Sequence, residues 1–139
     1  MEKAKGIDVS HWQGRIDFDK VKSQGYSFVM INAGYGKYIS QKDENFEKNY
    51  AAARKAGLNI GTYWYSYALT EADALAEAKT FLEAVKGKKF EYPLAFDIED
   101  VSQSELPNAA INKIIEAFCD YLENNGYYAA VWTFSRSRG

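Results

Sequence analysis

The segment YPLAFDIED (residues 92–100) places acidic side chains at the end of an apolar stretch. In a strand, Asp97 and Glu99 leave the same face, with Cα atoms roughly 6.7 Å apart. Two carboxylates held this close suit acid catalysis on a glycosidic bond. They would also suit a metal ion, or a solvated strand end with no chemistry, so the pattern alone leaves three interpretations open.

A third carboxylate, Asp8, lies inside the short apolar segment GIDVS (residues 6–10). Burying a carboxylate there is costly unless it is paired or used. Asp8 is either a hydrogen-bonded strand-end residue or a third acid that raises the pKa of Glu99 by like-charge repulsion. Asp100 is out of phase with the pair, and we expect it to be solvated or to cap a helix.

Aromatic residues surround these acids. Tyr63 and Tyr65 share one face of a strand, where they either fill the core or line the site, whereas Trp64 points the other way and is expected in the core. Trp12, in the loop after the first strand, is a candidate for stacking on a sugar. The segment GYG (residues 34–36) lacks the spacing of a phosphate-binding motif.

Short apolar segments alternate with helical patterns along the whole chain, which predicts one parallel α/β domain over residues 1–139 with right-handed crossovers. Thr70 and Pro107 are expected at the starts of the last two helices. The predicted strands are Gly6–Ser10, Phe28–Gly34, Asn59–Tyr67, Tyr92–Glu99 and Tyr127–Phe134. The predicted helices are Asp17–Ser23, Asn45–Ala56, Thr70–Val85 and a last one from about Pro107 to beyond Leu122.

Five strands and four helices fit either an open doubly wound sheet or part of a (β/α) barrel. Both architectures place function at the carboxyl ends of the strands. The polar candidates gather at those ends: Asp8, Asn32, Tyr35, Tyr63, Tyr65, Asp97 and Glu99.

Composition narrows the possible partners. The chain has 139 residues, a net charge of −2 and no basic run, so we expect neither nucleic acid nor an anionic membrane as partner. Cys119 and His11 are the only residues of their types, which excludes an intrachain disulfide and a histidine-rich metal site. Cys119 is expected to be a buried, inert thiol. We expect no cofactor and no bound metal.

Four segments, in order, resemble family 25 of the glycoside hydrolases, the Chalaropsis-type lysozymes. They are GIDVSHWQGRIDF (6–18), AGYG (33–36), AGLNIGTYWYSY (56–67) and YPLAFDIE (92–99). The resemblance covers residues 4 to 132. It implies a barrel fold and hydrolysis of the β-1,4 bond between N-acetylmuramic acid and N-acetylglucosamine in peptidoglycan.

The resemblance also implies roles for the acids. Glu99 matches the general acid, which needs a raised pKa, and Asp97 and Asp8 match the acids beside it. Asp97 would stabilise the cationic transition state, either by attacking the sugar or by orienting its N-acetyl group, and both routes retain configuration. The residues expected to bind the glycan are Tyr63, Tyr65, Trp12, Tyr35 and Asn32.

Three departures from the family pattern stand out. Asn32 replaces a frequent arginine, Trp64 replaces a frequent histidine, and only five of the barrel's eight strands are found. The resemblance therefore implies a barrel truncated at its C-terminus. Such a remnant would leave two apolar sheet edges, so we expect a dimer or higher oligomer joined through the first or fifth strand.

Two alternatives to an active muramidase remain at this stage. One is a weakly active or inactive protein that only binds the cell wall. The other is a metal-dependent phosphotransfer enzyme with Asp8, Asp97 and Asp100 around Mg²⁺. Residues 1–6 are charged and contain no apolar signal-peptide core, so an extracellular or wall-located chain would need a removed leader or release by lysis.

Overall fold

The computed structural model describes residues 6–9 and 16–133. Within them, five parallel strands form one sheet in the order β1-β2-β3-β4-β5. The strands are β1 (Gly6–Val9), β2 (Phe28–Tyr35), β3 (Asn59–Tyr65), β4 (Leu94–Ile98) and β5 (Ala129–Thr133). Each predicted strand is present, although Ser10 and Phe134, expected at two strand ends, lie outside the described residues.

The four predicted helices are also present: α1 (Phe18–Ser23), α2 (Phe46–Lys55), α3 (Glu71–Ala84) and α4 (Asn108–Asn124). The side chain of Thr70 accepts a hydrogen bond from the backbone N–H of Asp73 at 3.1 Å, which confirms the predicted N-cap of α3. Pro107 occupies the N-cap position of α4, one residue before the expected first turn. Cys119 on α4 is half-buried rather than buried, and burial raises the pKa of its thiol to about 11.

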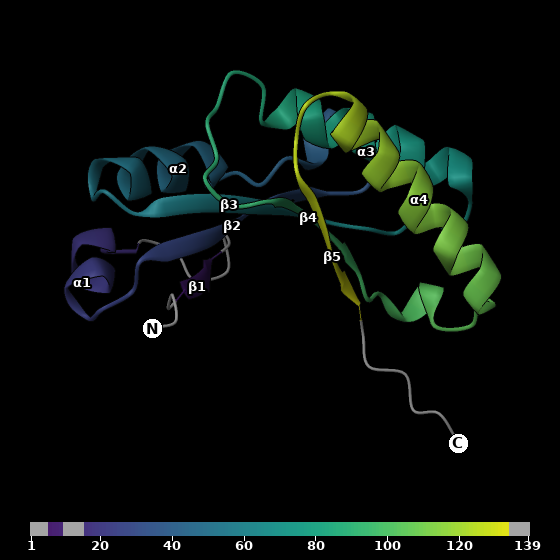
Figure 1. Cartoon of the computed structure of the whole chain (residues 1–139), viewed down its shortest axis with the longest axis horizontal. Coiled ribbons are helices and arrows are strands. Elements are labelled where there is room, and N and C mark those ends of the chain that lie inside the picture. Colours follow the sequence, from purple (N-terminus) through teal and green to yellow (C-terminus); the bar gives the residue numbers. More distant parts are fainter. Residues whose placement is uncertain (1–5, 10–15, 134–139) are drawn as a thin grey trace.

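The strand order decides between the two predicted architectures. A doubly wound sheet reverses its order at a switch point and carries helices on both faces. Here the strands follow the chain in sequence, and the curved sheet has its helices along its outer side (Figure 1). The prediction of an incomplete (β/α) barrel is therefore confirmed, and over the described residues the barrel is not closed.

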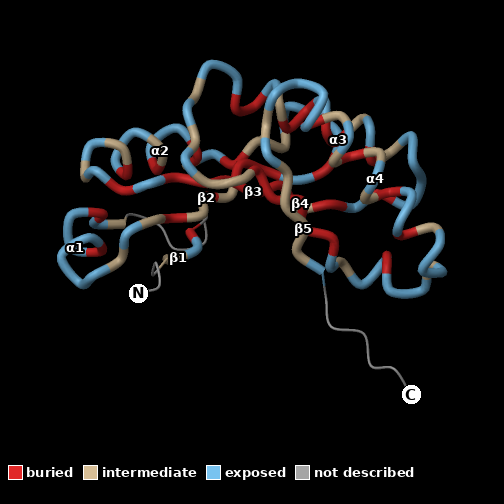
Figure 2. The backbone as a smooth tube through the Cα atoms, viewed as in Figure 1, coloured by how far each residue is buried: buried red, intermediate tan, exposed pale blue. Residues whose placement is uncertain are grey.

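The core lies between the sheet and the helices, where buried backbone follows the middle strands (Figure 2). Trp64 on β3 is fully buried, as predicted, and stacks on Phe81 of α3 at a centroid distance of 5.4 Å. Phe118 of α4 stacks on Phe96 of β4 at 3.7 Å. Large aromatic side chains thus fix the two long helices against the strands that carry the candidate acids.

The inner side of the sheet is less completely covered. Phe28 and Tyr92 stack there at 4.3 Å and are both half-buried. A Cβ atom at Gly61 would lie 2.5 Å from Sδ of Met30, so this close contact between β2 and β3 requires glycine. The inner face is therefore packed locally without being buried throughout.

Within the described residues, β1 and β5 each pair with one neighbour and form the two edges of the sheet. The expected pairing between copies of the chain through these edges stays a prediction, and a monomeric mass by light scattering at micromolar concentration would contradict it. The described part of the chain contains no helix with the length and apolar character needed to cross a bilayer.

Candidate active site

Strand β4 carries Asp97 to the inner face of the sheet. Every residue of this strand is buried, and Asp97 itself is 5% exposed. Asp97 lies in register with Tyr65 of β3 and Trp132 of β5. Glu99 follows one residue after the strand ends and is exposed. The predicted pair therefore consists of one buried and one accessible carboxyl group.

Burial raises the pKa of Asp97 to about 7, and the charge of Glu99, a hydrogen bond with Glu99 and the charge of Asp8 act in the same direction. Atom Oδ1 of Asp97 is buried and accepts no hydrogen bond from the described residues. Burial and the neighbouring negative charges thus make the Asp97 carboxyl group harder to ionise than a solvated aspartate.

Asp8 reaches the same region from β1 and is held there by Tyr63. Although Asp8 as a residue is exposed, partial burial of its carboxyl group raises its pKa, and a hydrogen bond with Tyr63 opposes that rise. The charge of Glu99 raises the pKa of Asp8 further, so the three acids act on one another electrostatically. Sequence reasoning placed these three together, and the structure does bring them together.

Tyr63 is 8% exposed and links β1 to β2. Burial raises the pKa of its hydroxyl, with hydrogen bonds to Asp8 and Asn32 on its two sides. Asn32 is also the in-register neighbour of Tyr63 on β2. Tyr63 is therefore a core residue by the burial of its ring, and its hydroxyl contacts an acid of the candidate site. Its contact with a glycan stays a prediction.

Tyr65 does not reach the acid pair with its hydroxyl, which donates to Oδ1 of Asp100 at 2.9 Å. Asp100 caps the 3₁₀ helix η3 (Val101–Gln103) through the backbone N–H of Ser102, as its phase in the sequence predicted. Both oxygens of Asp100 thus accept hydrogen bonds within this cap. No cluster of three or more His, Cys, Asp or Glu in the described ranges could hold a metal ion.

Tyr35 ends β2 at the same edge and is 43% exposed. Its ring meets Tyr67 edge-on at 5.9 Å, and Tyr67 lies 5.1 Å from the ring of Tyr65. These three tyrosines form an accessible aromatic group beside the acids. Trp12, the predicted sugar-stacking residue, lies outside the described residues.

Sequence reasoning missed Trp132, which packs on Tyr63 at a centroid distance of 4.9 Å and is half-buried. Alternation along β5 places Trp132 and Ala130 on one face, and the strand register sets them beside Asp97 and Ala95. Without the strand register, nothing in the sequence says which face of the fifth strand meets the acids.

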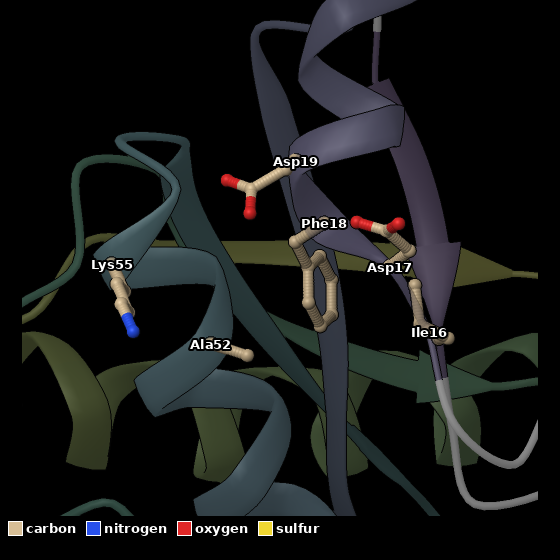
Figure 3. Close-up of a pocket in the computed structure, with 6 residues that line it drawn as sticks. All are labelled: Ile16, Asp17, Phe18, Asp19, Ala52 and Lys55. Atoms are coloured by element: carbon tan, nitrogen blue, oxygen red, sulfur yellow. The ribbon is translucent and has the colours of Figure 1, made fainter.

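Two cavities lie away from the acid pair. One of about 630 Å³ is bordered by α1 and α2, with Phe18, Ala52 and Lys55 in its lining (Figure 3). The other, of about 190 Å³, lies beside the tyrosine group and is lined in part by Gly36, Tyr67 and Glu77. Neither contains a carboxylate of the predicted site.

Comparison with known proteins identifies the class to which this fold and site belong. The sequence profile of glycosyl hydrolases family 25 matches residues 7–136. This chain belongs to that family. It is 33% identical over 131 residues to the autolytic lysozyme of Clostridium acetobutylicum, covering 94% of this chain and 38% of that protein. It is 47% identical over 62 residues to lysozyme M1 of Streptomyces globisporus, covering 45% and 20% of the two chains.

Solved structures agree with this assignment. A bacterial lysozyme from Streptomyces coelicolor matches with a TM-score of 0.80 and 30% identity, covering 95% of this chain and 63% of that one. The modular autolysin LytC from Streptococcus pneumoniae, solved with a synthetic peptidoglycan ligand, matches with a TM-score of 0.81 and 27% identity, covering 95% and 32%. The chain thus spans less than two thirds of these relatives.

Proposed function

We propose that this protein is a peptidoglycan hydrolase that cleaves the β-1,4 bond between N-acetylmuramic acid and N-acetylglucosamine. The family and the lysozyme names of its relatives support this activity, as does the peptidoglycan ligand of LytC. The observation that carries the proposal is the pair of carboxyl groups at the end of β4, in which Asp97 is buried with a raised pKa and Glu99 is accessible. The substrate places the site of action at the cell wall.

The two carboxyl groups take different roles because their surroundings differ. Glu99, exposed beyond the strand, donates its proton to the leaving glycosidic oxygen. Asp97 lies deeper and, once ionised, places a negative charge beside the cationic sugar of the transition state. The reaction needs Glu99 protonated and Asp97 ionised. The anomeric carbon is first attacked from the face opposite the leaving group, either by the Asp97 carboxylate or by the N-acetyl oxygen of the sugar that Asp97 orients. Water, deprotonated by Glu99, then displaces this group, so that configuration is retained.

The neighbours of the pair support these roles. Asp8 adds a second negative charge near the reacting sugar, and the hydroxyl of Tyr63 holds its carboxyl group in place. Asn32 fixes Tyr63 from the other side. Tyr35 and Tyr65 offer ring faces to the glycan at the edge of the site, and Trp12 stays a predicted contact.

The proposal is tested by incubating the chain with purified peptidoglycan and measuring new reducing ends. Glu99→Gln keeps the shape of the side chain and removes the transferable proton, so release is expected to fall about 1,000-fold. The rate should also decline at alkaline pH in the wild type, as Glu99 loses the proton that it donates. Equal release from both proteins, or a rate that is flat to pH 9, would contradict the proposed role of Glu99.

A second candidate is a wall-binding protein with weak or no activity, in which the accessible tyrosine group beside the acids supplies the ring faces that contact the glycan. Sedimentation with insoluble peptidoglycan separates the two candidates. Binding by the wild type and by Glu99→Gln, with no reducing ends from either, would favour this alternative.

A further inference from the structure

Glu77 is a buried carboxylate that the proposed chemistry does not use. It lies on the side of α3 that faces the sheet and is 2% exposed. Its Oε1 accepts a hydrogen bond from Oγ of Ser66 at 2.7 Å, and its Oε2 accepts one from the backbone N–H of Tyr67 at 2.8 Å. Both donors belong to the segment that leaves β3 at the carboxyl edge of the sheet. The Glu77 side chain of α3 thus fixes the position of the segment that follows β3.

Ser66 links Glu77, by hydrogen bonds, to the segment that follows β4. Its hydroxyl donates to Glu77 and accepts from Nε2 of Gln103 at 3.0 Å and from the backbone N–H of Ala68 at 3.0 Å. One donor and two acceptor positions are all that a serine hydroxyl offers, so its hydrogen bonds are complete. Ser66 and Gln103 are both 0% exposed, which makes each of these bonds costly to lose.

The hydrogen-bond network reaches the backbone on both sides of Glu99. On one side, Oε1 of Gln103 accepts a hydrogen bond at 3.2 Å from the backbone N–H of Asp100, the residue after Glu99. On the other side, the backbone N–H of Ser66 donates to the carbonyl oxygen of Asp97 at 2.8 Å. Glu99 therefore stands between two residues whose main chains are tied to the same buried network, while its own side chain is exposed.

We propose that Glu77 is a positioning residue for the hydrolysis: through Ser66 and Gln103 it fixes the backbone on both sides of Glu99 and so aims the Glu99 carboxyl group at the glycosidic oxygen. This inference rests on the proposed function. A helix residue outside the cleft then controls the geometry of the proton donor. Small displacements of a reacting group lower the rate steeply, so the network acts on turnover rather than on substrate binding.

The hydrogen-bond pattern makes the substitution Glu77→Gln a sharp test. Two donors point at the two oxygens of Glu77, and an amide replaces one of those oxygens with a third donor. Ser66 has no acceptor position left to receive it, so at least one bond of the network is broken in the variant. Gln103→Met cuts the network at its other end. It removes the bonds of Gln103 to Asp100, to Ser66 and to the carbonyl oxygen of Ala68, and it leaves both bonds of Glu77 in place.

The experiment compares these two variants with Thr62→Val. Thr62 is equally buried on β3, points toward the helices and donates to the carbonyl oxygen of Ile31 at 2.7 Å, so its variant loses one buried hydrogen bond far from Glu99. On soluble peptidoglycan fragments, kcat is expected to fall at least tenfold in Glu77→Gln and in Gln103→Met, with KM within twofold of the wild type. Thr62→Val should keep kcat within twofold although its Tm also falls.

A kcat within twofold of the wild type in either folded network variant would overturn the proposal, and so would an equal fall in Thr62→Val. If Glu77→Gln does not fold, Gln103→Met decides alone. Wild-type activity is measured first, because its absence contradicts the proposed function and not the positioning role. In that case the ¹³C carboxyl titration of Asp97 and Glu99 decides: Gln103→Met should change it, and an unchanged titration would overturn the inference.

Discussion

The two faces of the same sheet differ in what their side chains do. On the outer face, Trp64, Phe96 and Ile98 are fully buried under the helices and make only apolar contacts or, for Trp64, one hydrogen bond to a backbone carbonyl. On the inner face, Tyr63 and Asp97 are nearly as well buried, yet both interact with other polar groups. Alternation along a strand therefore separates residues that stabilise the fold from residues that carry chemistry.

Two adjacent residues of strand β4 show this difference between the faces most clearly. Phe96 and Asp97 are adjacent and both buried, but Phe96 stacks on Phe118 whereas Asp97 has a buried oxygen without a donor in the described structure. The first contact stabilises the folded state. Asp97 instead has a pKa that burial raises, which costs stability at neutral pH and fits the proposed acid catalysis.

The largest effect is expected at the inner face, from Asp97→Asn. Losing the negative charge beside the cationic sugar should lower kcat about 1,000-fold, equivalent to about 4 kcal/mol. The folded state should survive, because the amide fills the same volume. Reducing-end release and thermal unfolding measured on the same sample check this. A variant that keeps a tenth of the activity would place the stabilising charge elsewhere, with Asp8 as the nearest candidate.

The matching change at the outer face is Phe118→Ala. Removing a fully buried ring that stacks on Phe96 should cost about 3 to 4 kcal/mol of unfolding free energy, and urea denaturation measures it. Activity per folded molecule should stay the same, since the ring does not face the acids. A selective loss of kcat at temperatures where the variant is folded would break the proposed separation of the two faces.

The free energy of unfolding should also depend on pH, through the buried carboxyl groups of the inner face and of Glu77. Folding raises the pKa of Asp97 from 3.8 to about 7 and that of Glu77 from 4.5 to about 7, in both cases chiefly by burial. The folded chain therefore binds these protons more tightly than the unfolded chain. The resulting stabilisation is complete below about pH 4 and is lost as the pH rises to about 7.

The unfolding free energy should thus fall by about 5 kcal/mol between pH 5 and pH 7.5, with about half from each of the two groups. Asp97→Asn should reduce this dependence of the unfolding free energy on pH. Phe118→Ala should lower the unfolding free energy equally at every pH and leave the dependence unchanged. Denaturation at several pH values checks both. A stability that rises over this range would mean that the carboxyl groups of lowered pKa, such as Glu47 and Glu91, dominate instead.

The smallest effect is expected for Tyr63→Phe, which keeps the buried ring and removes its hydroxyl. The hydrogen bond from Tyr63 lowers the pKa of Asp8, so the variant should show a higher pKa for Asp8 in a ¹³C carboxyl titration. A loss of about fivefold in kcat, or about 1 kcal/mol, should accompany it. An unchanged titration of Asp8 would show that Tyr63 acts only as an inner-face core residue.

Much of this arrangement could be predicted from the sequence, because it follows from local periodicity. Alternation placed Asp97 with Glu99 and turned Trp64 into the core, and the phase of Asp100 predicted its role as a cap. Strand register and long-range hydrogen bonds could not be predicted in this way. Trp132 meets Tyr63 only through the register of β5. Glu77 bonds to Ser66, and Ser66 bonds to Gln103, so this network joins three separate segments.

The sequence contains one sign that Glu77 is unusual, but this sign alone does not indicate what Glu77 does. Glu77 follows Ala74 and precedes Ala78 and Phe81 on the apolar stripe of α3, where a charged residue is out of place. Only the partners supplied by the loop after β3 show why a carboxylate belongs there. Sequence patterns thus identify the reacting groups more readily than the residues that hold them in position.

The central claim is that the inner-face pair cleaves the bond on the reducing side of N-acetylmuramic acid. The most direct measurement digests purified peptidoglycan, reduces the new ends with borohydride and identifies them by mass spectrometry. Muramitol ends from the wild type, and none from Glu99→Gln, are the predicted result. Reduced glucosamine ends, or muramitol ends in equal amounts from both proteins, would contradict the claim.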